Sequence, residues 1–111
     1  MPSIKIETSA DLDRTSREAL AVKISSACAA WLNKPEKVVQ VRIESGLTIS
    51  FGGKVCEDSA FVVIALIGKI ADDTKAALPE KFAALLAEYG IAPERIFLRY
   101  MESDASAWGW I

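Results

Sequence analysis

The residue with the clearest chemical potential is the proline that follows the initiator methionine in the opening stretch MPSIKI. Aminopeptidases remove methionine before a small residue, and Pro2 would then carry a free secondary amine. An α-amino group titrates at a pH of about 7.7–8.0, and desolvation or a nearby cation lowers that pKa. Pro2 could therefore act as a neutral base at physiological pH. The alternative is structural, because proline also occurs at the first position of a strand, where its missing N–H faces solvent.

The absence of histidine narrows the chemistry that the rest of the chain can supply. The 111 residues include no histidine, which removes the most common general base and the most common transition-metal ligand. The two cysteines, Cys28 and Cys56, form no Cys-x-x-Cys motif, and we expect both to be buried and unreactive, as in a reducing compartment. Neither of the Gly-Lys pairs has the preceding glycine of a phosphate-binding loop. We therefore expect no metal and no cofactor, and any base must be a carboxylate, a lysine, a tyrosine or the amino terminus.

The composition excludes several classes of protein. Hydrophobic residues make up 51% of the chain and charged residues 25%, with a net charge of −2. This balance is typical of one globular domain, here residues 1–111, and argues against nucleic-acid binding, which uses a basic patch. No apolar run is long enough to span a membrane, and the first residues lack the pattern of a secretory signal. We expect a cytoplasmic protein without membrane or nucleic-acid partners, with unconventional export as the open alternative.

Hydrophobic periodicity predicts two helices among several strands. The helices are expected at residues 11–33 and 72–89, with Pro79 at the first turn or a kink of the second helix and Gly90 after its end. Strands are expected at residues 4–8, 38–44, 59–70 and 95–101, with short strands within 45–54 and 107–111. The inner helix faces are predicted to carry Leu20, Ile24, Ala27, Cys28 and Trp31 in the first helix and Phe82, Leu85, Leu86 and Tyr89 in the second.

Two stretches of the chain resemble each other at an offset of 58 residues. KPEKVVQV at 34–41 and APERIFLR at 92–99 share a Pro-Glu-basic-aliphatic pattern between a helix and a strand. The chain therefore divides into pseudo-repeats of about residues 2–58 and 59–111, each a β-α-β unit. Right-handed crossovers place both helices on one face of a four-stranded mixed sheet in an α+β fold with short edge strands. The other face is partly apolar, which predicts that a second copy covers it in a symmetric homo-oligomer.

Stretches along nearly the whole chain resemble one protein family. They are Met1-Pro2 with the strand after it, NKPEKV, SFGGK, IGKI, IAPERIFLRY and WGW. Together they resemble the tautomerase superfamily, in its macrophage migration inhibitory factor and D-dopachrome tautomerase branch. The resemblance implies a homotrimer with an active site at each subunit interface. It also implies a cofactor-independent isomerase, a keto–enol tautomerase that uses Pro2 as general base on α-keto acids such as phenylpyruvate.

The resemblance also implies residues that hold the substrate. Lys34 matches the lysine that binds the substrate carboxylate, although it could be an ordinary surface charge after a helix. Ile67 matches the position whose backbone N–H contacts the same carboxylate. Ser3 follows the base and could line the pocket. Lys34 and Ile67 keep the family pattern, whereas Ser3 is a candidate by its position beside Pro2 alone.

The far wall of the implied pocket departs from that pattern. The Tyr-x-Asn-Tyr strand of the family reads here as Phe97-Leu98-Arg99-Tyr100, so a hydroxyl is lost and a cation is gained. Arg99 could grip a second anionic group of a substrate, or it could point outward and pair with Glu102 or Asp104. Trp108 stands where the family has a smaller residue and could narrow the entrance. The sequence stops at Ile111, before the family's usual last residues, so part of the wall and of the trimer contact is expected to be weaker.

Two other readings of the function stay open. One is a non-enzymatic binding or signalling protein that keeps the trimeric fold around a vestigial pocket. The other is a ferredoxin-like ligand-binding domain outside the family, which has the same order of elements. Thiol–disulfide oxidoreductase activity is not expected, because Ser59 rather than cysteine stands three residues after Cys56.

Overall fold

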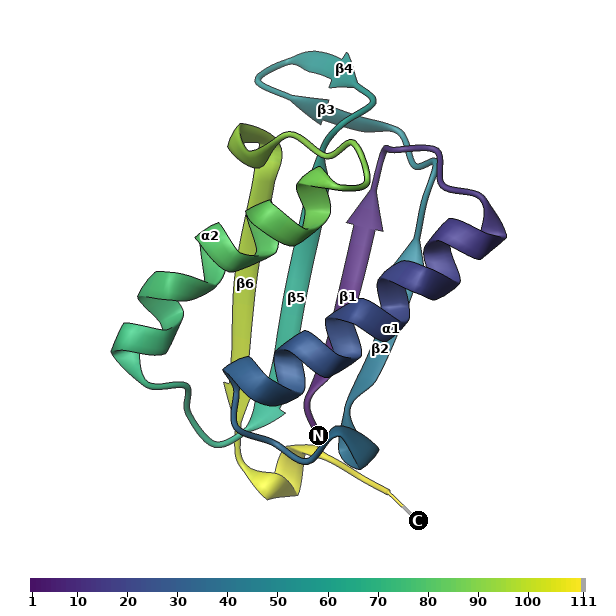
Figure 1. Ribbon diagram of the computed structural model, residues 1–111. Coiled ribbons are helices and arrows are strands. Elements are labelled where there is room, and N and C mark those ends of the chain that lie inside the picture. Colours follow the sequence, from purple (N-terminus) through teal and green to yellow (C-terminus); the bar gives the residue numbers. More distant parts are fainter. Residues whose placement is uncertain (111) are drawn as a thin grey trace.

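A four-stranded sheet carries both long helices on one face, with a small hairpin at one end (Figure 1). The structure is a computed structural model that describes residues 1–110. In chain order the elements are β1 (Ser3–Thr8), α1 (Arg14–Trp31), β2 (Gln40–Glu44), β3 (Ile49–Phe51), β4 (Lys54–Cys56), β5 (Ala60–Ile67), α2 (Asp72–Ala87) and β6 (Ile96–Ser103). Short 3₁₀ turns occupy Glu36–Val38, Pro93–Arg95 and Ala105–Ala107.

The sheet confirms the prediction of two β-α-β units. Its strand order is β2-β1-β5-β6. β1 pairs with β2 in parallel and β5 with β6 in parallel, while β1 and β5 meet antiparallel at the centre. Each unit therefore contributes one parallel pair and the helix that connects it.

The two units repeat at two slightly different offsets. The first strands and the buried helix positions repeat at 58 residues, as with Leu20 and Leu78. The second strands repeat at 57 residues, because Ser3 pairs with Gln40 whereas Phe61 pairs with Phe97. A slip of one residue moves a strand's side chains to the opposite face. Gln40 therefore corresponds in space to Phe97. The repeated motif, with its offset of 58 residues, would have suggested Leu98 instead.

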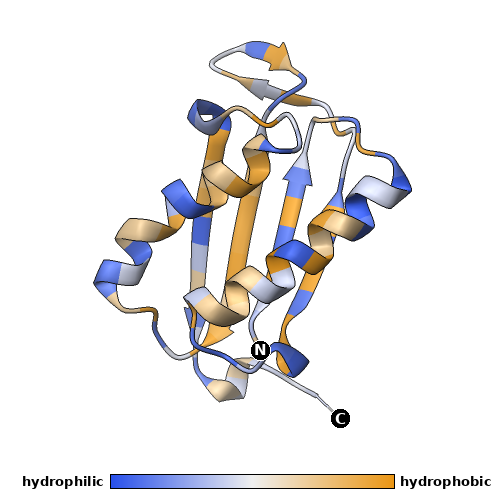
Figure 2. Ribbon diagram, in the orientation of Figure 1, coloured by the Kyte–Doolittle hydropathy of each residue, from blue (hydrophilic) through white to orange (hydrophobic). Residues whose placement is uncertain are grey.

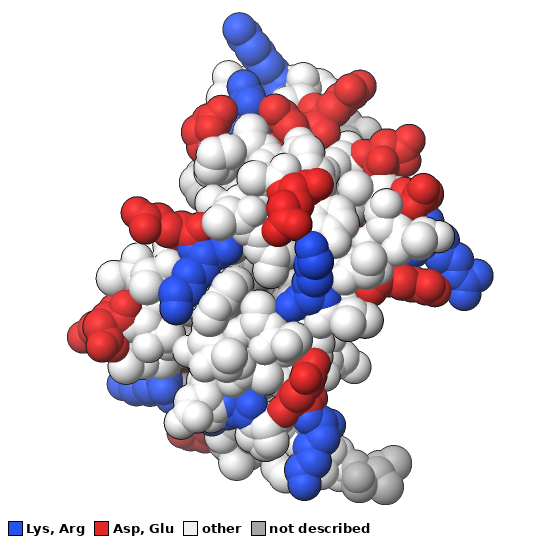
Figure 3. Space-filling model, in the orientation of Figure 1, with Lys and Arg blue, Asp and Glu red and all other residues white. Residues whose placement is uncertain are grey.

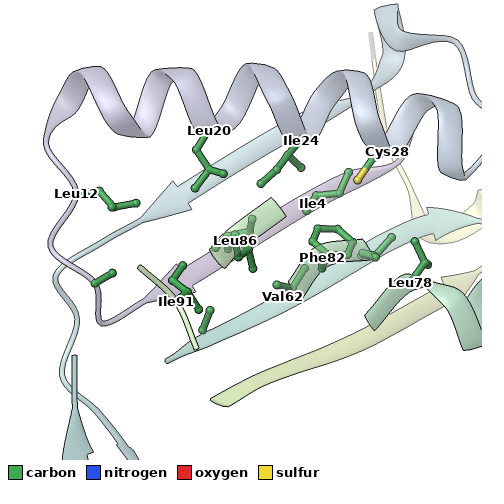
Figure 4. Close-up of a cluster of buried hydrophobic side chains, with 14 of the residues drawn as sticks. Ile4, Leu12, Leu20, Ile24, Cys28, Val62, Leu78, Phe82, Leu86 and Ile91 are labelled. Atoms are coloured by element: carbon green, nitrogen blue, oxygen red, sulfur yellow. The ribbon is translucent and has the colours of Figure 1, made fainter. Parts of the chain in front are cut away.

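The core lies between the sheet and the two helices (Figure 4). Strand residues alternate, so Ile4, Ile6, Val62 and Ile64 are fully buried against the helices. The predicted inner helix faces are confirmed at five positions that are fully buried, and the remaining four are partly buried. The fully buried positions are Leu20, Ile24, Cys28, Phe82 and Leu86.

Local sequence signals explain where the helices begin and how α2 tolerates a proline. Asp13 caps α1, since its carboxylate accepts a hydrogen bond from the backbone N–H of Ser16 at 2.8 Å. Pro79 lies inside α2, so the expected placement in the first turn is wrong, and the alternative of a position inside the helix stands. Proline has no N–H to offer the carbonyl of Lys75, four residues earlier. The Tyr100 hydroxyl donates to this carbonyl instead, at 3.0 Å.

The two sides of the sheet differ in chemistry. Figure 2 shows β5 as an almost continuous hydrophobic strand, whereas β1 alternates with polar residues. On the face away from the helices, Phe61 and Phe97 are partly exposed, and an ion pair joins Lys5 to Glu44 at 2.9 Å. On the helix face, acidic and basic side chains are interspersed (Figure 3), and Lys23 of α1 pairs with Glu88 just after α2 at 2.9 Å. The apolar part of the open face is thus confined to β5 and β6.

Several expectations for the loops and ends are corrected. The first helix is shorter than predicted at both ends, whereas α2 begins at Asp72 as predicted and ends two residues early. The stretch 45–54 contributes to a hairpin of β3 and β4 rather than a single strand. Cys56 is half-buried, although we expected it in the core with Cys28. The strand predicted at 107–111 is wrong over 107–110, because Ala107 ends a 3₁₀ turn and residues 108–110 join no strand within the described residues. Ile111 lies outside them. Neither α1 nor α2 is long and apolar enough to cross a membrane.

Candidate active site

A cavity of about 530 Å³ lies where β1 begins. The first residues of the chain and the segment after β6 come together at this end of the sheet (Figure 1). Its walls come from three segments that are distant in sequence, and most of them are apolar. The lining residues are Met1, Pro2, Ser3, Val38, Gln40, Trp108, Gly109 and Trp110.

Pro2 is a buried part of this wall and is fixed by the sheet. Its carbonyl accepts a hydrogen bond from the backbone N–H of Gln40 at 3.0 Å. This bond lies directly before the first residue pair of the parallel β1–β2 ladder, in which Ser3 faces Gln40. The position of the Pro2 ring therefore follows from the pairing of two strands rather than from a free terminus.

Ser3 and Gln40 form a polar pair beside Pro2. The Ser3 hydroxyl donates to Oε1 of Gln40 at 2.8 Å. Ser3 is only 7% exposed, so the buried hydroxyl anchors the end of a longer and more exposed side chain. Sequence reasoning did not identify Gln40, because its partnership with Ser3 depends on the parallel register of two strands 37 residues apart.

Trp108 forms another wall and is held by a short chain of hydrogen bonds. Its indole Nε1 donates to Oγ of Ser103 at 2.8 Å, and the Ser103 hydroxyl donates to the carbonyl of Leu66 at 3.1 Å. These contacts tie the half-buried indole to the ends of β5 and β6. Ser103 was not identified from the sequence either, because its role is to orient another side chain.

The two residues expected to hold a carboxylate lie nearby but do not line this cavity. Lys34 lines a separate hollow of about 220 Å³ together with Lys69 and the start of α2. Ile67 is the last residue of β5 and pairs with Ser103, which binds the Trp108 indole. The structure therefore brings together Pro2, Ser3 and Trp108 and places Lys34 and Ile67 outside their cavity.

Phe97 and Arg99 lie farther away within the same chain. Phe97 pairs with Phe61, which in turn pairs with Glu7, five residues along β1 from Pro2. At a rise of about 3.3 Å per residue, Phe97 lies on the order of 16 Å along the sheet from Pro2. Arg99 lies two residues closer, on the same face, and Glu102 pairs with Lys75 rather than with Arg99.

The cysteines lie outside this site. Burial in the core raises the pKa of the Cys28 thiol to about 12, so this group stays protonated and unreactive at neutral pH. Cys56 lies at the end of β4, where its thiol approaches the carbonyl of Ile49 at 3.8 Å. Neither thiol lines the cavity beside Pro2.

Comparisons with known proteins agree with the fold and extend over the whole chain. The family model described as macrophage migration inhibitory factor matches residues 1–111. D-dopachrome decarboxylase of Bos taurus is 31% identical over 102 residues, which cover 90% of this chain and 85% of that protein. A macrophage migration inhibitory factor homolog of Brugia malayi is 30% identical over 108 residues, covering 96% of this chain and 92% of that protein.

Comparison with a solved structure shows that the fold is shared as well as the sequence. The crystal structure of Leishmania major MIF2 superposes with a TM-score of 0.86 at 28% identity, over 99% of this chain and 93% of that one. Both the sequence and the arrangement of strands and helices are thus shared with proteins of this kind. The chain belongs to the macrophage migration inhibitory factor family, in the tautomerase superfamily branch that it shares with D-dopachrome decarboxylase.

Proposed function

We propose that this protein is a cofactor-independent keto–enol tautomerase that acts on aryl α-keto acids such as phenylpyruvate. The observation that carries the proposal is the position of Pro2, buried in the wall of a mostly apolar cavity of about 530 Å³. After removal of Met1, the Pro2 nitrogen is a secondary amine at that wall. Membership of the tautomerase superfamily supports the same class of reaction.

The walls of the cavity favour the neutral form of this amine. Among residues 1–110, none that lines the cavity carries a charged side chain, and desolvation among apolar groups disfavours an ammonium ion. The neutral amine takes a proton from the carbon next to the substrate carbonyl, so that a C–H bond breaks, an N–H bond forms and negative charge develops on the oxygen. The prolinium ion then returns the proton to that oxygen, which yields the enol and restores the base.

The substrate carboxylate needs a partner that the cavity itself does not supply. We propose that the Lys34 ammonium and the Ile67 backbone N–H bind it, from the neighbouring hollow and the end of β5. We also propose a homotrimer in which Phe97 and Arg99 of one subunit complete the site of the next. The open face supports this assembly, because its apolar part is confined to β5 and β6, where both residues lie.

The test follows the decay of the enol form of phenylpyruvate by ultraviolet absorbance. The protein is first shown by mass to have lost Met1. Pro2→Gly is expected to fold and assemble as the parent does but to lose about 10²–10⁴-fold in kcat, the usual contribution of a positioned base. A matched control carries extra residues before Met1, which keeps the Pro2 nitrogen in a peptide bond and should abolish turnover equally. Unchanged rates in either protein would exclude Pro2 as the base.

The second candidate function is a non-enzymatic binding protein. The observation in its favour is that the part of the chain that the structure describes, residues 1–110, places no cationic side chain in the cavity next to Pro2. Correctly processed protein that turns over neither phenylpyruvate nor D-dopachrome, the compound named for the Bos taurus relative, would favour this candidate. Phenylpyruvate turnover that depends on the Pro2 amine would exclude it as the sole function.

A further inference from the structure

The side chain of Gln40 gives the Pro2 cavity a polar group that is anchored at one end only. Its Oε1 accepts the hydrogen bond from the Ser3 hydroxyl at 2.8 Å. The same residue's backbone N–H binds the Pro2 carbonyl at 3.0 Å, so Gln40 is fixed to the first two residues of the strand. Within residues 1–110, no further hydrogen bond involves the Gln40 carboxamide, which leaves both N–H groups of Nε2 available.

Among residues 1–110, the other side-chain donors around the cavity are committed to other partners or are not anchored. The Ser3 hydroxyl is used on Gln40, and the Trp108 indole N–H is used on Ser103. Trp110 is 66% exposed and lies outside any helix or strand. The Gln40 carboxamide is therefore the anchored side-chain donor of the cavity wall that has no other partner.

We propose that Nε2 of Gln40 donates a hydrogen bond to the carbonyl oxygen of the substrate and is a catalytic residue of the site. The proposal rests on the tautomerase function proposed above. When Pro2 takes the proton from carbon, charge develops on this oxygen, and a donor already held in place stabilises it at little reorganisation cost. The carboxamide keeps its own protons throughout, since the proton that reaches the oxygen comes from the prolinium ion.

Ser3 acts on this reaction through Gln40 and is a positioning residue. Its hydroxyl holds Oε1, which orients the planar carboxamide with the nitrogen away from Ser3. Without that hydrogen bond the carboxamide is free to rotate and to present its oxygen to the substrate. An oxygen acceptor beside a developing negative charge opposes the reaction, so the orientation decides whether Gln40 helps or hinders.

Three variants test these roles by steady-state kinetics on phenylpyruvate. Gln40→Leu keeps the bulk and removes the donor, and kcat is expected to fall about 10²-fold, as for other lost oxyanion donors. Gln40→Glu replaces the donor by an anion of the same shape and should lose at least as much. Ser3→Ala is expected to lose about tenfold in the parent and to have no further effect in the Gln40→Leu background, which a merely structural serine would not show.

The matched control is Glu44→Leu, on the same strand and the same face but outside the cavity. It is expected to stay within about twofold of the parent in kcat. Each variant is compared with the parent by molar mass in solution and by urea unfolding, so that a loss of assembly or of fold is separated from a loss of chemistry. Gln40→Leu with parental kcat would overturn the proposal even if Pro2→Gly is inactive.

A second measurement does not depend on turnover. Gln40 is the only glutamine in the chain, so labelling with ¹⁵N-glutamine gives one side-chain amide signal in the NMR spectrum. Phenylpyruvate should shift this signal, whereas 3-phenylpropionate, which has the same ring and carboxylate but no keto oxygen, should shift it much less. Equal shifts with both ligands, or none with either, would overturn the role of Gln40. An amide shift specific to phenylpyruvate in a protein without turnover would instead mean that Gln40 binds the oxygen while the proposed tautomerase function fails.

Discussion

Equivalent positions in the two β-α-β units carry opposite chemistry. In the first unit Ser3 faces Gln40 across the parallel strands, and the two side chains share a hydrogen bond at 2.8 Å. In the second unit Phe61 faces Phe97 at the corresponding place. There the ring of Phe51, from the hairpin, lies 5.3 Å from that of Phe97, measured between centroids. One pair lines a cavity beside Pro2, and the other belongs to an aromatic cluster.

The difference shows which part of a repeated unit is free to specialise. Core positions such as Leu20 and Leu78 or Ile24 and Phe82 stay apolar in both units, because both helices must pack on the sheet. The open face has no such constraint within the chain. The first unit uses this freedom for a polar cavity wall and the second for an apolar surface that suits contact with another copy.

The largest expected effect comes from making the first unit resemble the second. Ser3→Phe combined with Gln40→Phe places two rings where the hydrogen-bonded pair now lines the cavity. These rings should fill it and block access to Pro2, so kcat/KM for phenylpyruvate is expected to fall by more than about 10²-fold. Both positions lie on the face away from the helices, but Ser3 is only 7% exposed, so a ring at this position should lower the free energy of unfolding in urea by about 1–3 kcal/mol.

The reverse exchange is the control for that prediction. Phe61→Ser combined with Phe97→Gln leaves the cavity of its own subunit unchanged but removes the ring pair of Phe97 and Phe51, and with it the ring that we propose for the neighbouring subunit's site. An aromatic pair contributes about 0.5–1.5 kcal/mol beyond the area that it buries, so this variant should lose stability or assembly. If the first double variant kept the parental kcat/KM, the cavity beside Pro2 would not be the active site.

The two helices allow a second and smaller comparison. α1 has Ala21 at the position that corresponds to Pro79 of α2, 58 residues later. Only α2 therefore needs Tyr100 to satisfy a carbonyl, that of Lys75. Tyr100→Phe keeps the ring and removes the donor, and it should lower the free energy of unfolding in urea by about 1 kcal/mol, the usual net value of a hydrogen bond.

A double-mutant cycle checks that this loss comes from the proline. Pro79→Ala supplies the missing N–H, so the carbonyl of Lys75 gains a helical partner. Tyr100→Phe should then cost much less in the Pro79→Ala background than in the parent. The same cost in both backgrounds would mean that the tyrosine hydroxyl stabilises the protein in another way.

The sequence predicted the fold wherever one face of an element is buried. The spacing of Leu20, Ile24 and Cys28 identified the inner face of α1, because burial against a sheet imposes a helical period. The offset of the second strands was not predicted. Pro35 comes before its 3₁₀ turn whereas Pro93 is the first residue of the other turn, so the shared motif hides a difference of one residue. A repeat of side chains is thus not always a repeat of backbone positions.

The site was predicted less completely than the fold. Pro2 attracted notice through its chemistry, and the structure places Ser3 and Trp108 beside it. Gln40 did not stand out, because within its own strand it is one polar residue of an alternating pattern. Its value comes from a partner on another strand, and register between distant parallel strands does not follow from local sequence. Contacts that need a neighbouring subunit, as proposed for Phe97 and Arg99, lie equally beyond local patterns.

The smallest expected effect concerns the hydrogen bonds that hold the loop before α1 in the first unit and the loop before α2 in the second. In the first unit the Leu12 carbonyl accepts a hydrogen bond from the Ser45 hydroxyl at 3.2 Å. In the second unit the corresponding contact is made by a carboxylate. Glu102 accepts hydrogen bonds from the backbone N–H of Ile70 and from the Lys75 ammonium, each at 2.7 Å. These two donors hold the pKa of Glu102 below its ordinary value of 4.5, and the Lys75 ammonium has the larger effect.

The stability that Glu102 supplies should therefore depend on pH, while that of Ser45 should not. A carboxyl whose pKa is lower in the folded state stabilises the protein above its ordinary pKa of 4.5, and this contribution is lost as the pH falls through the folded value. Glu102→Gln is expected to lower the Tm at about pH 7, and its difference from the parent should shrink steadily below a pH of about 4.5. The Leu12 carbonyl also accepts from the Arg17 guanidinium at 2.6 Å, which stays charged over the whole range. Ser45→Ala should therefore shift the Tm by the same small amount at every pH. If the Tm difference between Glu102→Gln and the parent did not change with pH, the charge of the carboxylate would add nothing to its hydrogen bonds. Glu102 and Ser45 would then stabilise their loops in the same way.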